Sequence, residues 1–139
     1  MALADYSDLE KEIAGSQAPS TLPSGTEAEL RIISVRDGVS DKNGAHYYMP
    51  VFDVPSHPLC AEFSTFFWDL ADRDKLEPKQ AARLLNQFKV FAECFGIDYS
   101  KPFSWVDDLP GKKGWAILGV RKSDEYGDQN TVKQFLARK

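Results

Sequence analysis

The residues of this sequence that could do chemistry are aromatic rings and cations that alternate along its β-type segments. An aromatic ring can stack on a flat ligand, and a lysine or arginine beside it can hold an anionic group. In chain order the candidates are Arg31, Arg36, Lys42, Tyr47, Tyr48, Phe66, Trp68, Lys112, Lys113, Arg121, Lys122, Tyr126, Lys133 and Phe135. Rings interleaved with bases are what single-stranded nucleic acid requires, because its bases stack and its phosphates attract cations.

These residues also have ordinary structural interpretations. Lysines on strand edges often serve only to block aggregation. Tyr47 and Tyr48 are neighbours on one strand and point to opposite faces, so only one of them can meet a ligand. Phe66 and Trp68 share a face that is either exposed or covered by a later connector. Phe135 is as well placed to cover a helix as to contact a ligand.

Signatures of covalent chemistry are absent from the sequence. It has no P-loop, no GxSxG motif and no HExxH motif. His46 and His57 are not spaced as metal ligands, and Cys60 and Cys94 lie in unrelated segments, which favours small core residues. We therefore predict a binding protein that is not an enzyme and that uses no cofactor or metal.

The charge of the chain is uneven. Its net charge is −4, but residues 112–139 carry seven bases and three acids, whereas residues 1–29 carry six acids and one lysine. Because the local field steers a charged ligand, we expect an anion to bind near the C-terminal region. No apolar run approaches the roughly 18 residues that span a bilayer, and the N-terminus does not resemble a signal peptide. We expect a cytoplasmic protein with no membrane partner.

Hydrophobic periodicity indicates which elements would position these residues. It predicts three strands, one helix and two further strands, over residues 28–36, 46–54, 59–68, 78–95, 115–120 and 131–136. The alternation slips at Ile32, which predicts a bulge in a strongly bent first strand. Pro78 suits the first turn of the helix, and Gly96 suits its C-cap.

Three strands, a helix and two strands is the element order of the OB fold, a five-stranded, partly open Greek-key barrel. We predict this mainly β fold with one long helix for a domain over residues 26–139. An antiparallel α+β sandwich and an SH3-like barrel are alternatives, but neither explains so long a helix at that position. Residues 1–25 are expected to form an arm, with a short amphipathic helix over residues 2–13 and a Ser/Pro/Gly linker over residues 15–25.

The final hairpin, GWAILGVRKSDEYGDQNTVKQFL, and the helix that ends in FGID resemble phage-encoded OB-fold single-stranded DNA-binding proteins. The resemblance covers residues 26–137. It implies sequence-independent binding of single-stranded DNA in phage DNA replication and recombination, in the host cytoplasm. It also implies hairpin contacts at Arg121, Lys122, Tyr126 and Lys133, and Tyr126 in the turn is the best single stacking candidate.

Many such proteins recruit partners through an acidic C-terminal tail, whereas residues 136–139 here read LARK. We expect the acidic arm to recruit replication or recombination proteins instead, or to mediate formation of a homo-oligomer. Two other functions stay open. The same aromatic residues could form a protein-interaction module that binds a host or phage protein, or the chain could be a subunit of a nucleic-acid enzyme.

Overall fold

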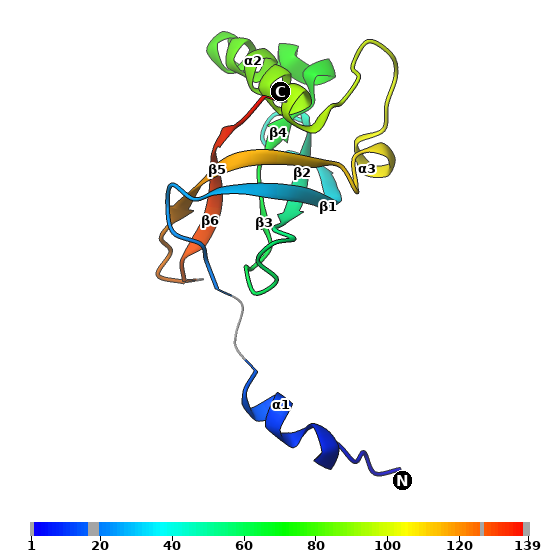
Figure 1. Cartoon of the computed structure of the whole chain (residues 1–139). Coiled ribbons are helices and arrows are strands. Elements are labelled where there is room, and N and C mark those ends of the chain that lie inside the picture. Colours follow the sequence, from blue (N-terminus) through cyan, green and yellow to red (C-terminus); the bar gives the residue numbers. More distant parts are fainter. Residues whose placement is uncertain (1, 17–19, 126, 138–139) are drawn as a thin grey trace.

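The computed structural model describes residues 2–16, 20–125 and 127–137 (Figure 1). Its elements are η1 (Ser7–Leu9), α1 (Glu10–Ala14), β1 (Glu27–Val39), β2 (His46–Asp53), β3 (Phe63–Ser64), β4 (Phe67–Trp68), η2 (Leu70–Lys75), α2 (Pro78–Phe95), α3 (Trp105–Asp108), β5 (Lys113–Arg121) and β6 (Gln129–Phe135). The strands form one antiparallel sheet in the order β3-β2-β1-β5-β6, and β4 also pairs with β2. The predicted mainly β architecture with one long helix is confirmed.

The long strand β1 connects the two halves of the sheet. Glu27 to Arg31 pair with β5, and the residues from Arg31 to Val39 pair with β2. The register on β2 shifts between Ile32 and Ser34, which confirms the predicted bulge. A bulge increases local bending and twist, so β1 can change partners without a break in the chain.

The predicted third strand, residues 59–68, is shorter than expected and is interrupted. Phe63 pairs with Phe52 and Phe67 pairs with Tyr48, so β3 and β4 share one register on β2. Between them the N–H of Thr65 donates to the carbonyl of Pro50 at 3.2 Å. A proline has no N–H to return this bond, which explains why the ladder is interrupted there.

The helix α2 lies across one end of the sheet (Figure 1) and has the predicted boundaries. Glu77 and Gln80 form a capping box at its start, and Gly96 ends it in the left-handed conformation at φ 69° and ψ 38°. Its buried residues are Leu84, Phe88, Phe91, Ala92, Cys94 and Phe95. Leu85, the neighbour of the buried Leu84, is exposed.

An aromatic core fills the space between α2 and the sheet. The ring centroid of Phe52 lies 5.8 Å from that of Phe63, 5.7 Å from that of Phe95 and 6.1 Å from that of Phe135. The connector after α2 adds Trp105 and Leu109, both buried. The connector therefore packs over the core.

The sheet is not closed into a barrel in the described part of the chain, because β3 and β6 do not pair with each other. The N-terminal segment bridges this seam at one end. Ser20 accepts a hydrogen bond from the N–H of Ala61 and donates its own N–H to Leu59, both at 2.8 Å. On the other side, Asn130 of β6 exchanges two hydrogen bonds with the backbone of Leu22, each of 2.9 Å.

Within the predicted linker over residues 15–25, Ser20 and Leu22 are therefore held at the two edges of the seam. Before the seam, η1 and α1 form a shorter helix than predicted, and all of their side chains are exposed. None of the helices in the described ranges is both long and apolar enough to cross a membrane.

Both cysteines are free thiols. Cys94 is buried in the core as predicted, whereas Cys60 is only half-buried beside the seam. Burial nevertheless raises the pKa of the Cys60 thiol, and its sulfur lies 3.6 Å from Oδ1 of Asn130.

Replacement of Asn130 tests the bridge across the seam. The Asn130 amide also donates to the carbonyl of Gly119 at 3.1 Å, so Asn130→Ala leaves several backbone groups without a partner. We expect the free energy of unfolding in urea to fall by about 2 kcal/mol, and the amide of Leu22 to lose hydrogen-exchange protection. The neighbouring Gln129→Ala is the control and should change stability by less than about 0.5 kcal/mol. Equal effects of the two variants would contradict the role of Asn130.

Candidate nucleic-acid interface

The pleat of β2 divides its side chains between two faces. Tyr48 and Phe52 point toward α2 and the core, where Tyr48 stacks on Trp105 with centroids 4.7 Å apart and planes at 4°. Tyr47 and Met49 therefore lie on the opposite, outer face. Of the two tyrosines, Tyr47 is therefore the one that can meet a ligand on the outer face.

Three rings gather on the outer face and form what we call the outer aromatic cluster: Tyr47, Phe66 and Trp68. Tyr47 stacks on Phe66 at 5.1 Å and 27°, and Phe66 meets the edge of Trp68 at 4.8 Å. Phe66 is 42% exposed and Trp68 is half-buried, whereas Phe63 and Phe67 are buried. The cluster therefore leaves ring surface open to solvent.

The Tyr47 ring lies across β1 because its partner there is a glycine. Gly38 pairs with Tyr47, and a Cβ atom on Gly38 would come within 2.5 Å of the Tyr47 hydroxyl oxygen. Any larger residue would push the ring away from this position. Gly38 thus helps to set the orientation of the outer aromatic cluster.

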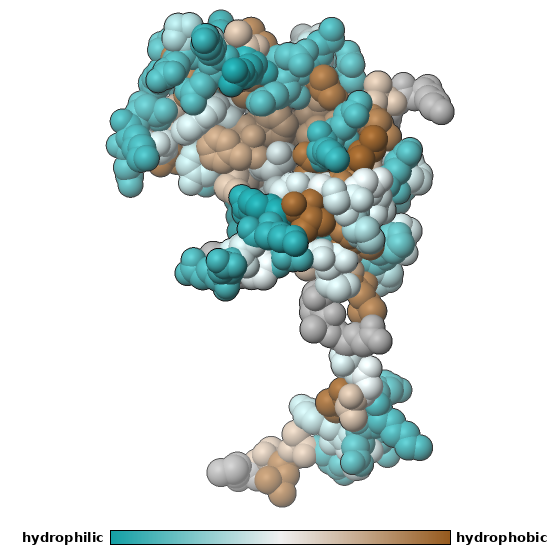
Figure 2. All heavy atoms as spheres, turned by 90° about the vertical axis from the view of Figure 1, so that its left-hand side faces the viewer, coloured by the Kyte–Doolittle hydropathy of each residue, from teal (hydrophilic) through white to brown (hydrophobic). Residues whose placement is uncertain are grey.

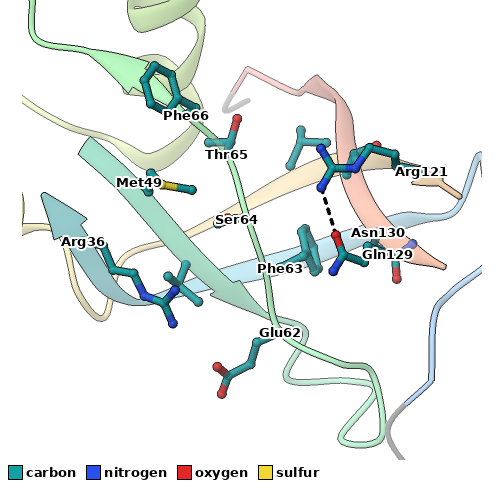
Figure 3. A pocket seen from close by; sticks show the side chains of 13 residues that line it. Arg36, Met49, Glu62, Phe63, Ser64, Thr65, Phe66, Arg121, Gln129 and Asn130 are labelled. Carbon is teal, nitrogen blue, oxygen red and sulfur yellow. Dashed lines mark hydrogen bonds between the residues drawn. The ribbon is translucent and has the colours of Figure 1, made fainter. Parts of the chain in front are cut away.

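Next to the cluster is a cavity of about 490 Å³, the outer groove, which crosses the seam between β3 and β6 (Figure 3). It is lined by Arg36, Met49, Val51, Glu62, Phe63, Ser64, Thr65, Phe66, Arg121, Gln129, Asn130, Thr131 and Val132. Figure 3 shows Arg36 and Arg121 on opposite sides of β3, with Phe66 at one end and Glu62 at the other. The groove thus combines two cations with an aromatic end.

Arg121 is held in place by its neighbour on the hairpin. Its Nη2 donates to Oε1 of Gln129 at 2.9 Å, a cross-strand bond drawn in Figure 3. The arginine is exposed, so its remaining donors face solvent or a ligand. Arg36 is likewise exposed and pairs with Met49 across β1 and β2.

A second cavity, of about 340 Å³, continues the seam toward α2. It shares Thr65, Phe66 and Val132 with the outer groove and adds Lys133. Phe66 therefore lies where the two cavities meet, and cations lie on both sides of it.

The loop between β1 and β2 carries Lys42, which is exposed at its tip. Asp72 anchors the end of this loop, because its carboxylate accepts the N–H of His46 at 2.8 Å and lies 2.7 Å from the ring Nδ1. Hydrogen bonds from His46 lower the pKa of Asp72 to about 2. Since the folded pKa is depressed, this contribution to stability is present above pH 3.8 and is lost as the pH falls through about 2.

Four of the predicted basic residues lie on the outer face or its bordering hairpin: Arg36, Arg121, Lys122 and Lys133. Arg31 does not belong with them, because its Nε and Nη2 atoms both donate hydrogen bonds to the carboxylate of Asp53. Lys113 lines a different cavity with Glu27 and Glu29, and the partly buried Lys112 precedes it. These three basic residues are removed from the candidate site.

Two predicted aromatic contacts are also corrected. Tyr48 is covered by Trp105, and Phe135 packs in the core at 5.4 Å from Phe91 and 5.9 Å from Phe95. Tyr48 therefore lies on the covered face, whereas the half-buried Phe135 also lines the cavity of about 340 Å³ next to Phe66. Tyr126, the best stacking candidate from the sequence, lies outside the described residues.

The sequence reasoning missed several residues of the groove. Met49 could have been found, because it is two positions from Tyr47 on the same face of β2. Gln129 and Thr131 could not, because only the position of β6 beside β3 brings them to the groove.

A scan against protein-family models and a search of the curated proteins both returned no match to this chain. Within the described ranges no group of three or more His, Cys, Asp or Glu side chains could hold a metal ion. The rings of the outer aromatic cluster can stack on a flat ligand, and Arg36 and Arg121 can bind an anion.

The assignment of Tyr48 to the covered face can be tested by pH. Burial, followed by the charges of Asp69 and Asp37, raises the pKa of Tyr48 above its ordinary value of 10.0. Stability that depends on its neutral form is present below pH 10.0 and is lost as the pH rises through the folded pKa. Absorbance titration should therefore show a late phenolate step that Tyr48→Phe removes and Tyr99→Phe does not. If the step persists in Tyr48→Phe, the assignment is wrong.

Proposed function

We propose that this chain is a sequence-independent single-stranded DNA-binding protein that acts in phage DNA replication or recombination, in the cytoplasm of the host. The observation that carries the proposal is the outer aromatic cluster beside a groove with an arginine on each side. Stacking on an exposed ring contributes on the order of 1–3 kcal/mol per base, whatever the base. Cations along the groove would track the phosphates and release counterions.

The strand order supports an OB-type architecture for this domain. β1, β2 and the interrupted strand formed by β3 and β4 precede α2, and β5 and β6 then add to the free side of β1. In that architecture the seam between β3 and β6 is the open edge of a barrel. The ligand face of an OB fold is made by its second and third strands and two flanking loops, which here carry the cluster, Lys42 and Lys122.

The acidic net charge does not oppose this function, because the charged side chains that line the groove are mostly basic. Arg36, Arg121 and Lys133 line the two connected cavities, against the single carboxylate of Glu62. A strand that follows the seam would pass Phe66 between these cations. We propose that Phe66 is the central stacking residue of the described part of the chain.

Binding of a labelled oligo(dT), followed by fluorescence anisotropy at low salt, tests the proposal. Phe66→Ala should weaken binding by about 1–3 kcal/mol, with little change in salt dependence, because the residue is uncharged. Trp115→Ala removes an equally exposed aromatic residue that does not line either seam cavity, and should leave the affinity unchanged. Absence of oligonucleotide binding by the wild type would reject the proposal and favour a protein-interaction module.

Two arginines provide a matched test of the phosphate contacts. Arg36→Gln should reduce the slope of log affinity against log salt by about 0.7, the value for one phosphate contact on a single strand. Arg31→Gln should leave the slope unchanged, because Arg31 is paired with Asp53 away from the groove. Equal slopes for the wild type and Arg36→Gln would exclude the role proposed for Arg36.

A further inference from the structure

A separate cavity, which we call the helix-side cleft, lies on the face of the sheet opposite the outer groove. This helix-side cleft, of about 840 Å³, is lined on the α2 side by Leu85, Phe88 and Lys89, and on the connector side by Tyr99, Phe103 and Trp105. Phe88 lies at the centre, with its ring centroid 5.8 Å from that of Tyr99 and 6.1 Å from that of Phe103. The cleft is therefore an apolar, aromatic-walled surface.

Part of this apolar lining is open to solvent. Leu85 is 49% exposed and Tyr99 is 54% exposed, although both belong to a cleft whose base is buried. Neighbouring apolar side chains that stay exposed together on a concave surface commonly mark an interaction site. The ligand of the outer groove cannot cover them, because they lie on the opposite face.

The rim of the cleft is basic. Lys89 and Lys101 both line it, against the carboxylate of Asp69. Lys101 lies 3.6 Å from Asp98 in a pair whose lysine side chain is 74% exposed, so this contact is weak and easily exchanged. Asp69 is partly engaged as the cap of η2, where it accepts the N–H of Ala71. The cleft therefore suits an apolar segment that carries negative charge.

The N-terminal arm has those properties. Leu3, Tyr6, Leu9 and Ile13 recur at helical spacing and are all exposed, and residues 2–16 carry four acids and one lysine. Figure 2 shows apolar side chains on the surface of the arm. A helix this short is marginal on its own and needs a surface to pack against.

We propose that the arm of one copy docks in the helix-side cleft of a second copy of this chain. Charge complementarity and matched apolar surfaces favour this occupant. The anchor of the arm at Ser20 is fixed to the loop around Leu59, and both views show the arm beyond the end of the sheet that is opposite to α2 (Figures 1 and 2). The cleft of a neighbour is therefore better placed to receive the arm than its own.

Such a contact is heterologous, because the arm and the cleft are different surfaces. Repeated contacts of this kind link copies head to tail, as a ring where the rotation between copies closes and as an open array where it does not. A short helix buries less than the roughly 1,200–2,000 Å² of a stable interface, so the association of free protein is weak and depends on concentration. If the proposed function is correct, copies held on one DNA strand would meet at high effective concentration and bind cooperatively.

The experiment uses the full chain without DNA, so that it does not depend on the proposed function. Sedimentation velocity over a wide concentration range should show weak self-association of the wild type. Leu9→Asp removes an apolar contact of the arm, and Leu85→Asp removes one of the cleft. Each should weaken self-association about tenfold or more, because a charge replaces a buried apolar side chain.

Mixing provides the decisive measurement. Leu9→Asp retains an intact cleft and Leu85→Asp retains an intact arm, so the mixture should form a one-to-one complex that neither variant forms alone. Val39→Asp, a substitution of a similarly exposed apolar residue outside the cleft and away from the anchor of the arm, is the control and should associate like the wild type.

Three results would overturn the proposal: a wild type that stays monomeric at every concentration, self-association unchanged in Leu85→Asp, or no complementation on mixing. The first would include an arm that docks in its own cleft. Thermal unfolding of each variant excludes loss of folding as the cause of lost association. Self-association without oligonucleotide binding would support this contact and reject the proposed function. Oligonucleotide binding without self-association would support the proposed function and reject this contact.

Discussion

Packing of the Phe52 ring against Phe63, Phe95 and Phe135 is the interaction on which the rest of this structure depends. It joins β2, β3, α2 and β6 in one aromatic core. Since side chains alternate along a strand, the burial of Phe52 fixes the face of every other residue on β2. A slip of one residue would bury Tyr47 and Met49 and expose Tyr48 and Phe52.

The same constraint gives the domain two different surfaces. On the covered side, α2 and the connector pack over Tyr48 and leave the helix-side cleft at their margin. On the outer side the rings of Tyr47, Phe66 and Trp68 contact one another. The two proposed roles, DNA binding and contact with a second copy, therefore use separate faces and need not compete.

The seam between β3 and β6 connects fold and function. An unpaired strand edge is normally protected against association with other chains. Here residues 20–22 satisfy one end of both edges through Ser20 and Asn130, while the rest of the seam remains hollow. The bridge ends at this point, and the unpaired edges of β3 and β6 beyond it border the outer groove. The segment that forms the bridge also fixes where the N-terminal arm leaves the domain.

Local patterns in the sequence determined the long helix among the strands, its ends at Pro78 and Gly96, and the bulge at Ile32. These features depend on backbone chemistry and periodicity over a few residues, which a sequence states directly. Only the tertiary structure decided which tyrosine of the pair faces outward, that Phe135 belongs to the core and Arg31 to an ion pair, and that Ser20 and Leu22 close one end of the seam. Each of these outcomes depends on a partner far away in the chain, such as Trp105, Phe91, Asp53 or Asn130. Such a partner is brought close by the packing of the whole domain, which the spacing of nearby residues does not specify.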